Sequence, residues 1–310
     1  MKRIQYHRYG GPETMRLEDF ELEDPTEGLV AVKVRFAAIN PIDWKLRNGQ
    51  MKIVTGNAFP RAMGMDFSGT VLSVGSGVTR LAPGDPVFGM ARLKQCGAFG
   101  EAVITKQSFL VRKPDAVSFE HAACLATPGV MAWMGLVEKA RLQAGNQVFV
   151  NGCAGAVGEA AVQVARMLGA TVSGACGAND MERMRDLGVE HVYDYRRTDL
   201  ARLDARFDVV YDTAATMSPS VGRLLLKKHG VFLDLDPAPS KFVRALLSRR
   251  FKIVICSANA DNLGRVALAA SHGQLQLPIG AIVPLPEAAR LISDVESGKK
   301  IGGKGVIAMP

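Results

Sequence analysis

Residues 147–177, QVFVNGCAGAVGEAAVQVARMLGATVSGACG, constrain the fold more than any other stretch of the chain. The apolar run Val148–Val150 is typical of a buried parallel strand, and it leads into glycines spaced Gly-x-x-Gly-x-x-Gly. Small and apolar residues at helical spacing then predict a helix over 159–168, and a second strand follows over 171–175. The stretch therefore predicts a strand, a glycine turn, a helix and a second strand.

Each glycine of this turn has a predicted role. Gly152 allows a tight turn, Gly155 lets the backbone approach a phosphate, and Gly158 lets the helix pack closely on the strand. A helix that begins at such a turn offers free N–H groups and a positive dipole end to a pyrophosphate. A strand–helix turn without a ligand is the alternative, but the flanking strands and the helix favour a dinucleotide site.

Length, composition and charge set broad limits. A chain of 310 residues is long enough for two domains, and 48% hydrophobic content is ordinary for a globular protein. No apolar run approaches the roughly 20 residues of a membrane span, and the N-terminus lacks the apolar core of a signal peptide. We therefore expect a cytoplasmic protein without a membrane partner. The net charge of +8 suits an anionic dinucleotide, whereas the scattered basic residues disfavour nucleic-acid binding.

Cysteine and histidine spacing argues against metal sites and disulfides. The five cysteines are dispersed without a Cys-x-x-Cys pair, and the five histidines show no ligand spacing. This distribution predicts neither a disulfide framework nor a structural zinc site.

Three regions follow one another along the chain. Residues 1–118 contain short strand-like runs broken by Gly and Pro, which predicts a mostly β domain. Helical patterns cover 119–125 and 130–139, and from 146 onward strands alternate with helices, which predicts a parallel sheet covered by helices. The C-terminal residues resemble the first region, being rich in turns and ending in a strand over 305–308.

Six separated stretches, in order, carry a family resemblance: NPIDWK from Asn40, GMDFSGTVLSVGSGVTRLAPGDPVFG from Gly64, TPGVMAW at 127–133, NGCAGAVG from Asn151, FDVVYDT at 207–213 and SGKKIGGKGVIAM near the end. On these residues the chain resembles the zinc-free quinone oxidoreductase branch of the medium-chain dehydrogenase/reductases. The resemblance implies an α/β fold, with a GroES-like catalytic domain over 1–118 and 262–310. A Rossmann domain with a doubly wound parallel sheet would be inserted at 119–261. It also implies a homodimer, for which the apolar run 253–255 would be an edge strand.

The same resemblance bears on metal binding. Zinc-dependent relatives carry a Cys where this chain has Asn40 and a His where it has Met65, and neither of these residues supplies a zinc ligand. The structural zinc loop of such relatives needs four cysteines around 91–100, where only Cys96 occurs. We therefore expect no metal ligands and no zinc.

The end of the second strand predicts the nucleotide. NAD-binding enzymes usually place an acid about 20 residues past the glycine turn, and that position is Cys176. The missing acid permits NADPH, although the basic residue usual in the family is here Asn179. By resemblance, Tyr195 contacts the 2′-phosphate with Arg196 beside it, and Lys304 is a basic cofactor contact. We predict NADPH rather than NADH, with these cofactor-binding residues: Asn40, Gly129, Val130, Gly152, Ala154, Gly155, Ala156, Val157, Cys176, Gly177, Asn179, Tyr195 and Lys304.

Three residues are candidates for catalysis. Asn40 matches a residue beside the nicotinamide in the family, and the alternative is a turn-forming Asn before Pro41. Asp43 and Lys45 are candidates for polarising a carbonyl or relaying a proton, and the alternative is a salt bridge. The family commonly has a Thr where this chain has Met131, so backbone groups at 129–130 are the remaining candidates there.

The resulting prediction is an NADPH-dependent, zinc-free oxidoreductase that transfers hydride to a quinone or to an α,β-unsaturated carbonyl such as an enal or enone. The alternative is an NADPH-binding protein with little turnover that senses redox state or binds a partner. A zinc alcohol dehydrogenase is disfavoured because the ligands are missing.

Overall fold

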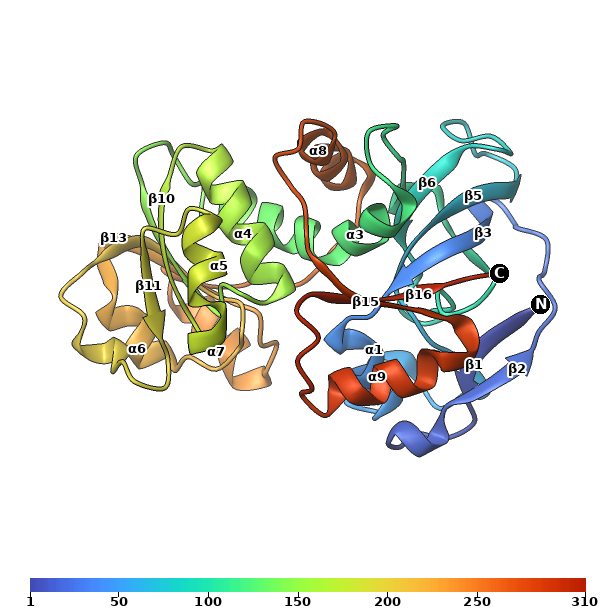
Figure 1. The fold of residues 1–310 in the computed structure, drawn as a ribbon, viewed down its shortest axis with the longest axis horizontal. Helices are drawn as coiled ribbons and strands as arrows, with labels where there is room; N and C mark the ends of the chain where they lie inside the picture. The colour runs from blue at the N-terminus through green and yellow to red at the C-terminus, as the bar shows by residue number, and fades with distance from the viewer. The chain divides into compact units, whose positions relative to one another are not determined.

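The computed structural model describes residues 1–238 and 240–310, which form two units (Figure 1). Unit 1 comprises Met1–Thr127 and Ala258–Pro310, and unit 2 comprises Pro128–Ser257. Each unit contains its own β-sheet structure. No helix in the described part of the chain has the length and apolar character that crossing a membrane requires.

Unit 2 is built on a parallel sheet of six strands, in the order β11-β10-β9-β12-β13-β14. Counted along the chain, this order is 3-2-1-4-5-6, the order of doubly wound dinucleotide-binding sheets. The strands are β9 (Gln147–Asn151), β10 (Thr171–Cys176), β11 (His191–Asp194), β12 (Phe207–Asp212), β13 (Leu226–Asp234) and β14 (Phe251–Ile253). The predicted alternation of strands and helices and the predicted α/β class are thus confirmed. Strand β14 lies at the edge of the sheet, but of the predicted edge run 253–255 only Ile253 belongs to it. A part for this edge in a dimer remains a prediction.

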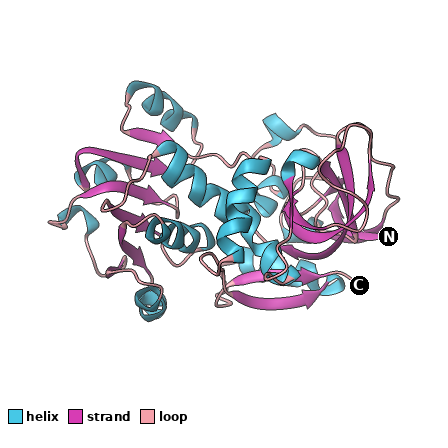
Figure 2. Cartoon of the chain, turned by 90° about the horizontal axis from the view of Figure 1, so that it is seen from above, coloured by secondary structure: helices cyan, strands magenta, loops and turns pink.

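Helices lie on both faces of this sheet (Figure 2). They are α4 (Ala156–Met167), α5 (Met181–Asp186), α6 (Pro219–Leu224) and α7 (Pro239–Leu247), with short 3₁₀ turns at Ala178–Asp180 and Leu200–Arg202. Aromatic and aliphatic side chains such as Phe149, Val210 and Phe232 fill the core between the sheet and its helices. The apolar runs that predicted buried strands therefore face helices on both sides.

Unit 1 contains a seven-stranded sheet and a three-stranded sheet. The larger sheet has the order β15-β16-β3-β5-β6-β8, with β7 paired to β3, and the smaller sheet has the order β2-β1-β4. The strands are β1 (Lys2–Tyr6), β2 (Arg16–Asp19), β3 (Leu29–Ala38), β4 (Arg61–Ala62), β5 (Asp66–Val74), β6 (Pro86–Met90), β7 (Ala102–Lys106), β8 (Leu110–Arg112), β15 (Ile279–Pro284) and β16 (Lys304–Ala308). The mostly β character predicted for the first region is confirmed.

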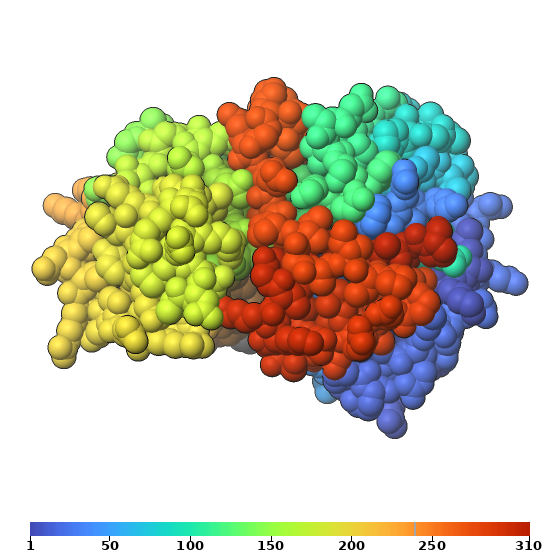
Figure 3. Space-filling model, in the orientation of Figure 1, coloured from blue at the N-terminus to red at the C-terminus, as the bar shows by residue number. Residues whose placement is uncertain are grey.

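The C-terminal segment differs from the prediction. It was expected to be rich in turns, but it contains two amphipathic helices, α8 (Ala260–Ser271) and α9 (Ala288–Glu296). Asn259 caps α8, accepting the N–H of Asn262 at 2.7 Å, and Ala288 and Ile292 of α9 are fully buried. The last strand, β16, pairs antiparallel with β3, so the red C-terminal residues lie against blue N-terminal ones within unit 1 (Figure 3).

The helical region before unit 2 also differs in detail. Two helical pieces were expected, with a break before Val130, but α3 (Phe119–Trp133) continues through Pro128 and then becomes a π-helix over Met134–Lys139. Proline lacks an N–H and therefore removes one hydrogen bond from the helix. Buried side chains on both sides of it, such as Leu125 and Val130, hold the helix together in spite of this loss. The remaining short helices of unit 1 are α1 (Pro41–Arg47), α2 (Lys52–Thr55) and 3₁₀ turns at Pro12–Thr14, Gln107–Phe109 and Leu285–Glu287.

Candidate functional site

The glycine turn of unit 2 follows the carboxyl end of β9. Gly152 has a φ of +78°, which L side chains rarely adopt, and a Cβ there would lie 2.8 Å from Cβ of Ala214. A Cβ on Gly158 would lie 2.1 Å from the carbonyl oxygen of Gly152, so the helix packs directly on the turn. Gly155 is different, because a Cβ there would meet only the Gly152 oxygen, at 3.4 Å. The turn is therefore tight at its first and third glycines and open at the second.

The open position lies at the start of helix α4. Gly155 is the N-cap residue, and the N–H groups of Ala156 and Val157 precede the first intrahelical hydrogen bond, from Glu159 to Gly155. Glu159 is buried in this first turn, where its charge would oppose an anionic ligand, but it pairs with Arg183, which also lies 3.2 Å from Asp180. Arg183 thus neutralises an acid beside the turn, and the helix end keeps its attraction for an anion.

The carboxyl ends of β10 and β11 lie side by side. Parallel pairing places Cys176 opposite Asp194, and the N–H of Tyr195 donates to the carbonyl of Cys176 at 3.2 Å. The Tyr195 side chain is 51% exposed, and the Arg196 guanidinium lies 5.4 Å from the centre of its ring. Asn179, just beyond Gly177, is exposed as well. This end of the sheet therefore presents a phenol, a guanidinium and an amide to solvent.

Sequence reasoning missed the acid at this edge. Asp194 ends β11, but its side chain is buried and its carboxylate accepts the N–H of Arg196 at 3.0 Å. The Asp194 carboxylate therefore points into its own turn and does not cover the Tyr195 hydroxyl or the Arg196 guanidinium, which stay accessible to solvent. Only the strand pairing shows that β11 ends beside β10, so spacing along the chain could not have found this residue.

A second group of residues that the sequence did not reveal holds the start of the glycine turn in place. Asn151 donates from Nδ2 to Oδ1 of Asp212 at 2.7 Å, and the Thr213 hydroxyl donates to the Asn151 carbonyl at 2.7 Å. Asp212 is fully buried, and burial raises its pKa, while hydrogen bonds from Asn151 and from the backbone at 216–217 lower it. These contacts tie β12 to the residue that precedes the first glycine.

Cys153 and Cys176 are buried thiols beside the turn. The two side chains contact each other, and this contact together with burial raises the pKa of the Cys153 thiol. A Cβ on Gly174 would lie 2.8 Å from Sγ of Cys153, which shows how little space this region has. A thiol with a raised pKa is a poor nucleophile, so these residues serve packing.

The predicted backbone contacts of Gly129 and Val130 lie within helix α3, where both residues are buried. Met131 is 8% exposed, and its carbonyl accepts a 2.9 Å hydrogen bond from the buried hydroxyl of Tyr211. The hydrogen bond from Tyr211 therefore fixes this part of α3 to strand β12. An apolar side chain stands where the family commonly has a threonine.

A buried polar cluster in unit 1 holds the other predicted residues. Strand β3 is antiparallel to both β5 and β16, and Ala38 pairs with Asp66 on one side and Val306 on the other. Antiparallel register therefore brings Lys304 opposite Asn40, two residues beyond Ala38. The ammonium of Lys304 donates to the Ile39 carbonyl and to Oδ1 of Asn40, both at 2.6 Å.

Asp43 lies behind Asn40 in the first turn of α1. Its Oδ2 accepts the backbone N–H of Asn40 at 2.7 Å, and Oδ1 is buried without a hydrogen-bond partner among the described residues. Burial, assisted by the nearby charge of Asp66, raises the pKa of Asp43 from 3.8 to about 8, and Lys304 opposes this shift. The Asp43 carboxyl group is therefore largely protonated at neutral pH.

Asp66 completes the cluster. It is fully buried and accepts the hydroxyl and the N–H of Thr127, at 2.6 and 2.8 Å. Burial raises the pKa of Asp66, while Lys304 and the Thr127 hydrogen bonds lower it. The structure thus brings Asn40, Asp43 and Lys304 together. It leaves Lys45 exposed and makes no ion pair between Lys45 and Asp43 within the described residues.

Comparisons with known proteins agree with this geometry. Residues 26–115 match the alcohol dehydrogenase GroES-like domain, and residues 187–307 match the zinc-binding dehydrogenase family. The chain is 28% identical over 322 residues to a chloroplast envelope quinone oxidoreductase homolog of Arabidopsis thaliana, covering 97% of this chain and 98% of that protein. It is similar in fold to the quinone oxidoreductase of Coxiella burnetii, with a TM-score of 0.90, 28% identity, and coverage of 100% of this chain and 99% of that one.

The two matched families place the chain among the medium-chain dehydrogenase/reductases, and over nearly its whole length it is similar to quinone oxidoreductases. The predicted family is confirmed, and the GroES-like match lies within unit 1. An Escherichia coli quinone oxidoreductase solved with NADPH adds support for the fold alone, with a TM-score of 0.84, 24% identity, and coverage of 99% of this chain and 100% of that chain.

The second matched family takes its description from zinc binding, so the zinc positions matter. Met65 is 8% exposed and packs against Cys96, with the two sulfur atoms 3.8 Å apart. Burial raises the pKa of the Cys96 thiol to about 12. Across residues 1–238 and 240–310, no group of three or more His, Cys, Asp or Glu side chains is placed to hold a metal ion.

Proposed function

We propose that this oxidoreductase uses NADPH and works without zinc, transferring hydride to a quinone or to an α,β-unsaturated carbonyl compound. The observation that carries the proposal is the glycine turn, which is open only at Gly155, next to an acid-free end of β10. The Arabidopsis and Coxiella relatives, both described as quinone oxidoreductases, support the choice of acceptor. When bound, the nicotinamide supplies the hydride, and the chain holds and orients the reactants.

In this proposal the cofactor phosphates lie at the N-terminus of α4. The N–H groups of Ala156 and Val157 provide donors, and Gly152, Ala154 and Gly155 shape the turn around them, with the N–H of Gly155 donating to the Gly152 carbonyl at 3.0 Å. The 2′-phosphate of NADPH contacts the exposed Tyr195 and Arg196 side chains, with Cys176, Gly177 and Asn179 lining the ribose. A guanidinium attracts a phosphate dianion more strongly than a neutral hydroxyl, which favours NADPH over NADH.

The polar cluster of unit 1 supplies the acceptor contact. Lysine is only a donor, so the bond from Lys304 identifies the oxygen end of the Asn40 amide and leaves Nδ2 as its donor end. Nδ2 itself donates to the Ala38 carbonyl at 3.4 Å and contacts the Asp66 carboxyl group. We assign to Nδ2 a hydrogen bond to the carbonyl oxygen of the acceptor, which would replace the long bond to Ala38 as negative charge grows on that oxygen during hydride transfer. Asp43 and Lys304 act as positioning residues for Asn40, and Lys45 is not part of this proposal.

An NADPH-binding protein with little turnover is the second candidate. The buried Met131, in place of the threonine common in the family, favours it, because an apolar side chain provides no hydrogen bond to the nicotinamide end. In that case NADPH would bind at the same turn without being consumed.

Steady-state NADPH consumption with a simple quinone and a metal chelator tests the proposal. We expect turnover that the chelator does not reduce, and a higher kcat/KM with NADPH than with NADH. Repeating the assay with an enal in place of the quinone ranks the two acceptor classes. Binding of NADPH without consumption by either acceptor would favour the second candidate, and stoichiometric zinc in active protein would contradict the zinc-free assignment.

A further inference from the structure

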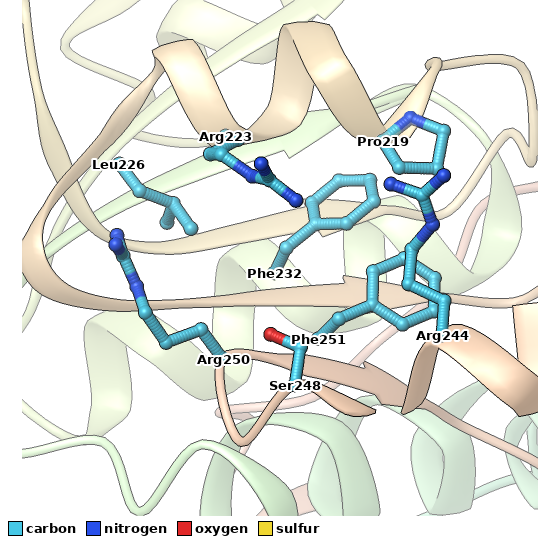
Figure 4. Close-up of a pocket in the computed structure, with 8 residues that line it drawn as sticks. All are labelled: Pro219, Arg223, Leu226, Phe232, Arg244, Ser248, Arg250 and Phe251. Carbon is cyan, nitrogen blue, oxygen red and sulfur yellow. The ribbon is translucent and has the colours of Figure 1, made fainter. Parts of the chain in front are cut away.

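Unit 2 contains a cavity on a part of the sheet separate from the glycine turn. A cavity of about 250 Å³ lies at β13 and β14, between helices α6 and α7 (Figure 4). It is lined by Pro219, Arg223, Leu226, Phe232, Arg244, Ser248, Arg250 and Phe251. Strand β12 separates β13 from β9, whose end carries the glycine turn, so the cavity is distinct from the proposed cofactor contacts.

Three arginines on three different segments border this cavity. Arg250 is fixed from Nε and Nη2 by the carbonyls of Gly230 and Lys227, at 3.0 and 2.6 Å. Arg223 on α6 and Arg244 on α7 have no ion-pair or hydrogen-bond partner among residues 1–238 and 240–310. Figure 4 shows both of these side chains extending over the aromatic rings. Two guanidinium groups thus border one hollow without a counter-charge.

The surroundings do not supply an anion. Residues 214–233 and 237–257 contain no Asp or Glu. The nearest acids in sequence, Asp234 and Asp236, both pair with Lys241, at 2.7 and 2.9 Å. The uncompensated positive charge is therefore available to a ligand, and arginine pairs with phosphate through two parallel hydrogen bonds.

The inner wall is apolar and aromatic. The rings of Phe232 and Phe251 lie 5.5 Å apart at 43°, and Leu226 and Pro219 extend this surface. Small-molecule sites typically combine such a wall with a few converging polar groups. Phe232 and Phe251 are 2% and 5% exposed, so only a small apolar group that reaches in between the arginines would add a contact that inorganic phosphate cannot make.

We propose that this cavity binds a compact organic phosphate monoester, with the phosphate held by Arg223 and Arg244 and an apolar body against Phe232 and Phe251. The Ser248 hydroxyl, also on the cavity wall, is a further donor to the phosphate. The site is independent of hydride transfer and of the choice of acceptor. The chemistry fits a free monoester and also the head of a phosphatidic acid, and the experiment distinguishes the two.

Isothermal titration of the full chain, already saturated with NADPH, tests the proposal with phenyl phosphate as the probe. We expect saturable binding at one site per chain, and about tenfold weaker binding of inorganic phosphate because its aromatic contact is missing. Arg223→Ala and Arg244→Ala should each weaken phenyl phosphate binding about tenfold or more, since each removes a charge-assisted contact. Arg223→Lys keeps the charge but loses the two-pronged contact, so it should weaken binding by a smaller factor.

Arg249→Ala is the matched control, because Arg249 is an exposed neighbour that does not line the cavity. Equal losses for Arg249→Ala and Arg244→Ala would show general surface charge instead of a site and would overturn the proposal. So would loss of the binding signal in the presence of NADPH, or binding unchanged by either cavity variant. If the chain binds both phenyl phosphate and phosphatidic acid vesicles, a lipid head is identified as a source of the ligand. If it binds the vesicles but does not bind phenyl phosphate, the result would contradict the pocket.

Discussion

Lys304 donates a 2.6 Å hydrogen bond from its ammonium to Oδ1 of Asn40, a residue 264 positions earlier in the chain. Only 6% of Lys304 is exposed, and its second acceptor is the carbonyl of Ile39. The contact exists because β16 pairs antiparallel with β3. The last strand of the chain thereby orients a predicted catalytic residue at the end of the third strand.

Replacing Lys304 tests whether it positions Asn40 or contacts the cofactor. Lys304→Met leaves two buried acceptors without a donor, and the free energy of unfolding should fall by about 1–3 kcal/mol. We expect kcat to fall about tenfold, with the NADPH dissociation constant changed less than about twofold, since the ammonium already has two partners. Lys299→Met, at an exposed ion pair, should change stability by less than about 1 kcal/mol. A loss of NADPH affinity at unchanged kcat would instead support the direct cofactor contact that the family resemblance implies.

Asp43 predicts a characteristic pH dependence of stability. Its folded pKa of about 8 lies above the unfolded value, so the native chain retains a proton that the unfolded chain releases. The stabilisation from this group is complete below about pH 4 and is lost as the pH rises to about 8, at up to about 1.4 kcal/mol per pH unit. Asp43→Asn should remove this slope. Urea unfolding of both proteins across this range measures it, and parallel curves would contradict the buried, protonated carboxyl group.

The two glycines of the turn should respond differently to the same added methyl group. Gly155→Ala meets no atom closer than 3.4 Å and has an ordinary φ of −82°, so stability should change by less than about 1 kcal/mol. NADPH affinity should nevertheless fall about tenfold, because the methyl group occupies the approach to the phosphates. Gly158→Ala should destabilise the chain by several kcal/mol, on the order of overpacked cores. Thermal unfolding and NADPH titration together separate these effects, and equal NADPH affinity in wild type and Gly155→Ala would contradict the site.

Arg196 and Arg197 form a matched pair for the nucleotide preference. Arg196 stacks on Tyr195, whereas Arg197 is 89% exposed and lies 4.0 Å from Asp194. Arg196→Ala should weaken NADPH binding about tenfold and leave NADH binding nearly unchanged, because only NADPH carries the 2′-phosphate. Arg197→Ala should change neither. Fluorescence titration with both nucleotides measures this, and an equal loss for NADH would show that Arg196 has a different role.

Most of unit 2 could be predicted from the sequence, because its signals are local. The apolar runs and the glycine triplet each lie within about a dozen residues, and a parallel sheet with this helix alternation has few topologies. The roles predicted for Gly152 and Gly158 correspond to a positive φ and to a forbidden Cβ position. The sequence does not show which strands lie side by side at their carboxyl ends, and Asp194 was missed for that reason.

Unit 1 was harder, because its important contacts link distant segments. Asn40, Asp66 and Lys304 meet through the register of β3, β5 and β16, which no spacing along the chain reveals. Asp43 and Lys45 were considered together because they are neighbours in sequence, but residues two apart in a helix do not face each other. The pattern of α9 was present in the sequence, yet the flanking glycines and prolines suggested turns instead.

A single-turnover reaction tests the central claim most directly. The protein is loaded with one equivalent of NADPH in the presence of a chelator, excess quinone is added, and the nicotinamide absorbance is followed. Hydride transfer predicts complete loss of that absorbance together with reduction of one equivalent of quinone. Bound NADPH that persists in the presence of quinones and enals would contradict the account and leave a nucleotide-binding protein in its place.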